Sequence, residues 1–276
     1  MNEVGAITGY IDVAQLVLYL FWIFFFGLVF YLQKEGRREG FPLEEDDGTM
    51  IDQSWVWIPE KPKVFKVKYG PHKEIESGPR DTRKLALKKV FPWAGSPFEP
   101  TGDPMADGVG PASYAERGDH PDWSVDGEAK IKPLRETPDF FPAGEDNDPR
   151  GMKVFGADGL VAGVVSDIWV DKGEYLGRYV EVDLSKGEAG GEGAVLLPFN
   201  FMRVKGPKNI FATLTGIEPM ERDIGVHVDA IRADQFSGVP KTKKPNEITL
   251  REEDMIMGYF GGGKLYAMPE RMGPLI

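Results

Sequence analysis

The feature that most constrains this chain is an uncharged apolar run near its amino terminus. Residues 13–32 read VAQLVLYLFWIFFFGLVFYL, and Gln15 is the one strongly polar side chain among them. A helix of this length spans about 30 Å, which is the thickness of the hydrocarbon core of a bilayer. We therefore predict a single transmembrane helix over residues 13–33, preceded by a short tail at residues 1–12.

Two other interpretations of this run fit it less well. A cleaved signal peptide starts with basic residues, whereas Glu3 and Asp12 precede this run and no Lys or Arg does. A buried helix of a soluble protein is rarely apolar on all sides. Aromatic side chains near both ends also favour the two membrane–water interfaces: Tyr10, Tyr19, Trp22, Phe30 and Tyr31.

Basic residues lie on one side of the run only. Lys34, Arg37 and Arg38 follow it directly. Because positive charge collects on the cytoplasmic side of membranes, we expect a periplasmic amino terminus and a cytoplasmic domain after the helix. The same three residues either contact anionic lipid headgroups or serve as topogenic charge alone.

Composition restricts what the rest of the chain does. The net charge of −11 argues against binding to nucleic acid, which needs clustered Lys and Arg. The chain has no cysteine, which excludes thiolate metal sites, disulfides and cysteine nucleophiles. Its 34 glycines and 22 prolines favour turns and short strands. Proline recurs through residues 34–110, so we expect an extended connector that lies along a cytoplasmic surface.

From about residue 150 the pattern becomes one of short β-type runs with turns between them, including MKVFG, LVAGVVSDIWVD, RYVEVDL, AVLLPFNFMRV and NIFATLT. We predict a small antiparallel barrel or sandwich within a domain at 111–250. A short helix and tail at 251–276 follow. Thr249 is the expected N-cap of that helix, and Glu252 completes a capping box.

Few motifs point to metal binding or catalysis. The stretch from Asp122 to Gly127 resembles the start of a calcium loop, but Pro133 stands where a bidentate Glu is needed. We expect a turn there, and also at 103–108. The run Gly261 to Lys264 lacks the spacing of a phosphate-binding loop, and the three histidines are scattered. No arrangement of nucleophile and base suggests an enzyme.

A hairpin is predicted over Ser166 to Leu184, where two alternating runs flank Lys172 and Gly173. Asp171 and Glu174 then lie close together at its turn. Two carboxylates this close disfavour each other's ionisation, which Arg178 opposes. Such a cluster either relays protons or is merely a solvated hairpin tip.

Several long strings, in order along the chain, resemble one family. They are the anchor and its flank (12–44), PTGDPMADGVGPASY (100–114), KIKPLR (130–135), SDIWVDKGE, LLPFNFMRV, and FSGVPKTKKPNEITLREEDMIMGYFGGGKLYA (236–267). Together they resemble the H subunit of the photosynthetic reaction centre of purple bacteria.

The resemblance implies a non-enzymatic subunit of the photosynthetic inner membrane with a cytoplasmic domain of the PRC-barrel type. Such a subunit caps and stabilises the L and M subunits, which carry bacteriochlorophyll, bacteriopheophytin, quinones, non-haem iron and carotenoid. No cofactor is then held mainly by this chain, and antenna polypeptides and membrane lipids surround the complex. The competing hypothesis is a membrane-tethered PRC-barrel adaptor for assembly or maturation.

The resemblance also assigns residues. It implies that Glu174, Asp171 and Arg178 carry protons to the secondary quinone, with Glu174 nearest the quinone. Where members of the family have two surface histidines at the point of proton uptake, this chain has Asp126 and Glu128. Carboxylates hold protons more briefly than histidines at neutral pH, and binding of divalent metal should be weaker here. His120 is a partial substitute, while Glu247 and Glu253 are assigned a supporting electrostatic role.

Overall fold

The computed structural model describes residues 10–38, 83–93, 95–206 and 224–273, with short pieces at 5, 7, 8, 45, 49, 63–66, 68, 69 and 73–75. These residues belong to two compact units, one that holds the amino-terminal helix and one that holds all described residues from 96 onward. Much of the predicted connector, including Trp55 and Trp57, lies outside the described residues.

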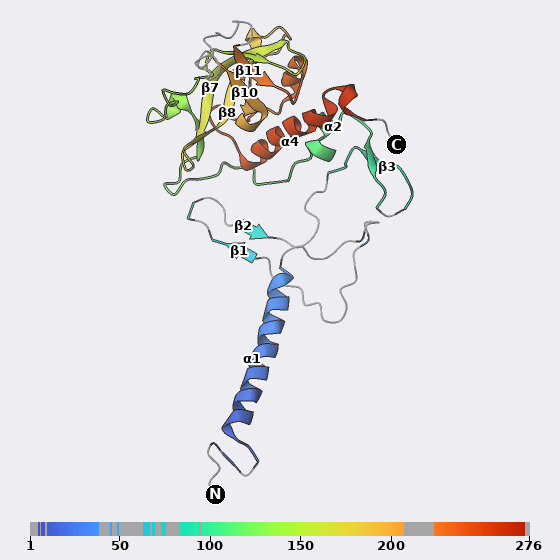
Figure 1. The fold of residues 1–276 in the computed structure, drawn as a ribbon, viewed down its shortest axis with the longest axis vertical. Coiled ribbons are helices and arrows are strands. Elements are labelled where there is room, and N and C mark those ends of the chain that lie inside the picture. The colour runs from blue at the N-terminus through green and yellow to red at the C-terminus, as the bar shows by residue number, and fades with distance from the viewer. Residues whose placement is uncertain are drawn as a thin grey trace, which may run out of the picture. The chain divides into compact units, whose positions relative to one another are not determined.

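The first unit contains helix α1 (Val13–Gly36), which is long and apolar enough to cross a membrane, as predicted (Figure 1). Its 24 residues span about 36 Å at 1.5 Å per residue. Asp12 caps its start, and Gln15 completes a capping box through its backbone N–H and side-chain oxygen. The one strongly polar residue of the apolar run is therefore used at the helix end. A small antiparallel pair, β1 (Lys63–Phe65) and β2 (Lys73–Ile75), belongs to the same unit.

The second unit is built on a seven-stranded sheet with the order β10-β11-β6-β7-β8-β9, and β5 also pairs with β7. Its strands are β5 (Ile131–Pro133), β6 (Lys153–Phe155), β7 (Val161–Asp171), β8 (Leu176–Asp183), β9 (Ala194–Pro198), β10 (Met202–Lys205) and β11 (Gly225–Val228). The mainly β domain is thus confirmed, with two corrections. The described strands form an open sheet rather than a closed barrel, and β6 and β11 are parallel in an otherwise antiparallel arrangement. The predicted run NIFATLT lies outside the described residues.

Strand β7 organises this sheet because it is the longest strand and is paired along both edges. β8 follows one edge, while β6 and then β5 share the other. The β7 side chains are accordingly buried at almost every position. Trp169 and Val165 of β7 and Phe236 and Phe260 from later segments are among the largest buried side chains of the core.

Helix α4 (Leu250–Tyr266) packs against helix α2 (Pro104–Asp107) and the 3-10 turn η1 (Gly110–Ala112) (Figure 1). The predicted cap is confirmed, since Thr249 accepts from the Glu252 N–H and Glu252 accepts from the Thr249 N–H. The helix is longer than predicted because it continues through its glycine run. A Cβ atom on Gly262 would lie 2.4 Å from the Ala112 Cβ, so glycine permits this close contact.

The remaining short elements connect these parts. A hairpin of β3 (Leu87–Lys89) and β4 (Phe98–Pro100) precedes α2. The described 3-10 turns besides η1 are η2 (Leu134–Glu136), η3 (Leu184–Lys186), η4 (Phe199–Phe201), η6 (Ala233–Gly238) and η7 (Pro269–Arg271). The predicted turn at 103–108 is partly helical, because Asp103 caps α2 and Gly108 ends it with a left-handed backbone.

Candidate functional site

The candidate site lies at the turn of the β7–β8 hairpin. The hairpin is confirmed, and its turn runs from Lys172 to Tyr175 between the paired residues Asp171 and Leu176. Tyr175 adopts φ of 57°, a left-handed backbone that costs a residue with a side chain about 1–2 kcal/mol. Its ring packs on Phe140 with the two centroids 5.4 Å apart, which helps to hold the turn in this form.

A β-bulge directs Arg178 toward the turn. Val170 pairs with Gly177, but Trp169 pairs with Tyr179, so Arg178 is an extra residue on β8. Bulges of this kind change the direction of a side chain. The Arg178 guanidinium donates to Glu174 Oε2 at 2.8 Å and to Asp171 Oδ2 at 3.3 Å. The bulge therefore joins the two carboxylates through one cation.

Asp171 is the fixed member of the group. Its side chain is only 1% exposed, and its Oδ1 accepts from the backbone N–H groups of Gly173 at 2.8 Å and Glu174 at 3.0 Å. Its Oδ2 faces Arg178 and the Lys130 ammonium, the latter at 3.6 Å. Two backbone N–H groups and two cationic side chains therefore hold this carboxylate from both of its oxygens. Asp171 thus positions the turn and the two cations.

Glu174 is the accessible member of the group. Its side chain is 48% exposed and contacts two cations, Arg178 at 2.8 Å and Lys130 at 3.6 Å. Lys130 also lies 3.8 Å from Asp122. We call Asp122, Lys130, Asp171, Glu174 and Arg178 the tip cluster.

Sequence reasoning missed two members of the tip cluster. Lys130 reaches it because the next residue, Ile131, pairs with Asp171 when β5 joins β7. Asp122 follows because the Lys130 N–H donates to its carbonyl oxygen at 2.8 Å. Neither contact is local in sequence, although the KIKPLR string does mark the position of Lys130.

The two carboxylates expected at the point of proton uptake lie in the loop before β5. Glu128 contacts Lys172 at 2.6 Å and Lys132 at 3.6 Å, and the hydrogen bond from Lys172 lowers the pKa of Glu128. Because Lys172 belongs to the hairpin turn, this contact brings the loop beside the tip cluster. Asp126 is exposed and forms no ion pair with any residue that the structure describes.

His120 lies earlier in the same part of the chain. Its ring stacks on Trp123 with the centroids 4.5 Å apart, and its Nδ1 lies 2.9 Å from the Pro121 carbonyl oxygen. Within the described residues no group of three or more His, Asp or Glu side chains is arranged to hold a metal ion. The Asp122–Gly127 stretch accordingly forms a turn, as predicted.

An acidic side chain outside the tip cluster, Glu253 of α4, interacts with it electrostatically. The Tyr179 hydroxyl donates to Glu253 Oε2 at 3.0 Å, which joins β8 to α4. Burial raises the pKa of Glu253, while the Tyr179 hydrogen bond and the charge of Arg178 partly oppose the rise. The pKa of Tyr179 is raised as well, by burial and then by the Glu253 charge. Glu253 is therefore within electrostatic range of Arg178, whereas Glu247 pairs with Lys244 at 2.8 Å in the preceding loop.

The basic residues after the anchor lie at the end of α1. Arg37 is the C-cap residue, Lys34 is in the last turn, and Arg38 contacts Glu35 at 3.1 Å. They belong to the first compact unit and are described separately from the tip cluster.

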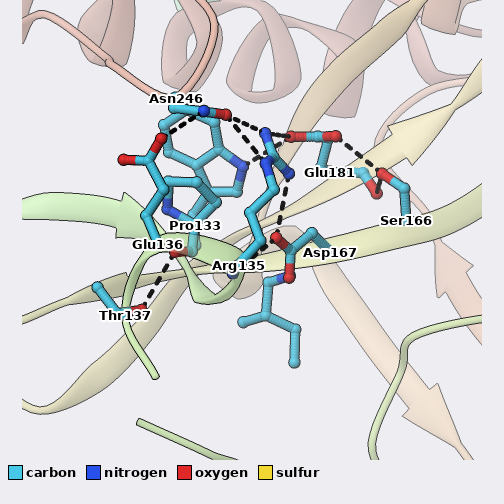
Figure 2. Close-up of polar contacts among 10 residues, drawn as sticks. Pro133, Arg135, Glu136, Thr137, Ser166, Asp167, Glu181 and Asn246 are labelled. Atoms are coloured by element: carbon cyan, nitrogen blue, oxygen red, sulfur yellow. Dashed lines mark hydrogen bonds and ion pairs between the residues drawn. The ribbon is translucent and has the colours of Figure 1, made fainter. Parts of the chain in front are cut away.

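Figure 2 shows a polar network around Arg135, whose partners Asp167 and Glu181 belong to β7 and β8. The guanidinium donates to Asp167 Oδ2 and Glu181 Oε2, each at 3.0 Å, and its Nε donates to Asn246 Oδ1 at 3.0 Å. Trp169 also donates to Glu181, at 3.0 Å. Burial by itself lowers the pKa of Arg135, but the hydrogen bond and charge of Glu181, then those of Asp167, raise it overall. The Arg135 guanidinium therefore stays charged, and its hydrogen bonds join η2 to the β7–β8 hairpin and to the loop before α4.

Comparison with known families matches two parts of the chain. The family model described as photosynthetic reaction centre, H-chain N-terminal region, matches residues 5–136. The model of the PRC-barrel domain matches residues 143–214. The first match spans the anchor, α2 and β5, and the second spans the β7–β8 hairpin that carries the turn of the tip cluster.

Proposed function

The chain belongs to the H-chain family of photosynthetic reaction centres, and on that premise we propose that its tip cluster conducts protons to the secondary quinone. The family associates with other reaction-centre subunits. We propose that the partners here are the L and M subunits, which the cytoplasmic domain caps and stabilises.

The chemistry of quinone reduction supports this role. Forming a quinol takes two electrons and two protons, and a quinone covered by protein receives protons only through ionisable side chains and ordered water. Glu174 is suited to such an exchange because its side chain is half exposed and its ion pairs are with two cationic side chains, Arg178 and Lys130. Asp171 is buried and fully bonded, so its proposed part is to keep Glu174, Arg178 and Lys130 in place. The observation that carries the proposal is this pairing of an accessible carboxylate with a buried one.

The direction of the chain in the membrane is part of the proposal. The basic residues at the end of α1 support a cytoplasmic position for the sheet domain, on the side where we propose that protons are taken up. Pigments, quinones and iron would then be held by the partner subunits, and the chain itself would catalyse no reaction. Antenna polypeptides and lipids are the other expected neighbours.

A tethered assembly or maturation adaptor remains the alternative. A PRC-barrel match alone fits both functions, but the H-chain match covers the anchor and continues to residue 136, which favours the reaction centre. Near-infrared absorption of the material that copurifies with the chain separates the two. Bands that bleach reversibly in light are expected, and a colourless product from pigmented cells would favour the adaptor.

The proposed route is tested by Glu174→Gln in the assembled complex. Removing the ionisable group should slow the second, proton-coupled electron transfer to the secondary quinone by several-fold, while primary charge separation keeps its rate. Flash absorption spectroscopy measures both. The matched control is Glu188→Gln, an exposed carboxylate on the loop after η3 that is not part of the tip cluster. An unchanged second transfer in Glu174→Gln would refute the assignment.

A further inference from the structure

The β3–β4 hairpin has a chemical character unlike the rest of the second unit. Residues 83–98 read RKLALKKVFPWAGSPF, which combines basic and apolar side chains in an acidic protein. The antiparallel pairing of Leu87–Lys89 with Phe98–Pro100 fixes the hairpin. Within its loop, the Val90 N–H donates to the Pro97 carbonyl at 3.0 Å, and the Phe91 N–H donates to the buried Ser96 hydroxyl at 2.8 Å. These hydrogen bonds hold the two strands and the residues next to them, at 90–91 and 96–97, in a defined arrangement.

Large apolar side chains of this hairpin lie at the surface. Phe98 is 54% exposed and Leu85 is 48% exposed, and Val90 and Phe91 are exposed as well. Four exposed large apolar side chains in one short hairpin are uncommon on a surface that faces only water. Such patches mark contact with a membrane or another protein.

Three lysines accompany these apolar side chains. Lys84, Lys88 and Lys89 form no ion pair with any residue in the described part of the chain, although Glu99 lies opposite Lys88 in the strand register. The Lys89 ammonium lies 5.9 Å from the centroid of the Phe98 ring, on the same face of the hairpin. We call Lys84, Leu85, Lys88, Lys89, Val90, Phe91 and Phe98 the hairpin patch.

We propose that the hairpin patch is a second membrane contact, which binds the surface of an anionic bilayer. Lysines attract anionic headgroups, and aromatic side chains favour the interface between headgroups and acyl chains. The lysines favour an anionic occupant, and the exposed aromatic side chains Phe91 and Phe98 favour a lipid interface over an acidic protein surface. The anchor also limits how far the hairpin can lie from the bilayer, because the 48 residues from the end of α1 to Lys84 span at most about 170 Å when fully extended. This proposal does not depend on the proton route.

The absence of cysteine makes a direct test possible. Pro92→Cys, exposed in the hairpin loop, would carry the only thiol of the full-length chain and accept a nitroxide label. The chain is inserted through its anchor into phosphatidylcholine vesicles, either neutral or with about one third phosphatidylglycerol. Electron paramagnetic resonance then compares collisions of the label with oxygen, which enters lipid, and with a nickel chelate, which stays in water. Val125→Cys, at a site 78% exposed on another loop, is the matched control.

In anionic vesicles, collisions of the Pro92→Cys label with the nickel chelate should fall several-fold relative to neutral vesicles, while the Val125→Cys label stays unchanged. Adding Lys84→Gln, Lys88→Gln and Lys89→Gln should remove the difference. A label that remains open to nickel in both vesicle types would overturn the proposal. So would a label that is protected in the assembled complex in neutral detergent without anionic lipid, because a partner polypeptide would then cover the patch.

Discussion

Replacing Asp171 by Asn tests whether this buried carboxylate holds the tip cluster together. Asn keeps one oxygen that can accept from the Gly173 and Glu174 N–H groups, at 2.8 and 3.0 Å in the wild type. It loses the negative charge, and its amide group would face Arg178 and Lys130. The turn should therefore open more easily even though the side chain keeps its size.

The magnitude follows from the contacts that change. Hydrogen bonds to a charged acceptor contribute about 1 kcal/mol more than those to a neutral one, for each of the two backbone donors. Loss of the anion beside Arg178 and Lys130 adds about 1 kcal/mol, because both cations are partly exposed and keep Glu174 as a partner. A total of about 3 kcal/mol corresponds to roughly a 100-fold change in the opening equilibrium of the turn.

Amide hydrogen exchange of the full-length chain in detergent is the suitable assay. The amides of Gly173 and Glu174 should exchange roughly 100-fold faster in Asp171→Asn at the same pH. Asp126→Asn makes the same chemical change at an exposed site and should leave exchange in the turn unchanged. If Asp171→Asn exchanged like the control, Asp171 would not be the residue that positions the turn.

Two further substitutions test the contacts of α4. Burial raises the pKa of Glu253, because the folded state favours the neutral carboxyl group. The stability that this group contributes is therefore complete below its ordinary pKa near 4.5, and it is lost as pH rises through the raised pKa of the folded state. Glu253→Gln should accordingly match the wild type in thermal unfolding at pH 4 and be the more stable of the two at pH 8; a difference independent of pH would contradict this. Gly262→Ala gains about 1 kcal/mol of helix propensity but places a Cβ 2.4 Å from that of Ala112, at a cost of about 2–3 kcal/mol. The melting temperature of Gly262→Ala should fall by several degrees relative to that of the control Gly261→Ala, whose new Cβ would lie 3.2 Å from the Pro111 oxygen. Equal melting temperatures for the two variants would exclude close packing as the reason for glycine at position 262.

Features that depend on neighbouring residues could be predicted from the sequence. The length and apolarity of α1 predicted a membrane helix, because crossing a bilayer depends on about twenty consecutive side chains. The Thr249 cap was equally predictable, since a capping box involves residues three positions apart. The hairpin and the closeness of Asp171 to Glu174 followed from one short alternating segment.

Features that depend on distant segments were decided by the tertiary structure alone. The register of β5 on β7 brings Lys130 and Asp122 to the tip, and the bulge in β8 directs Arg178 between the carboxylates. The packing of α4 buries Glu253 beside Tyr179, and it also explains why the helix continues through its glycines. The reason is physical: spacing along the chain determines which groups share a turn or a helix face. Which of them is buried, paired or accessible depends on elements that meet only after folding.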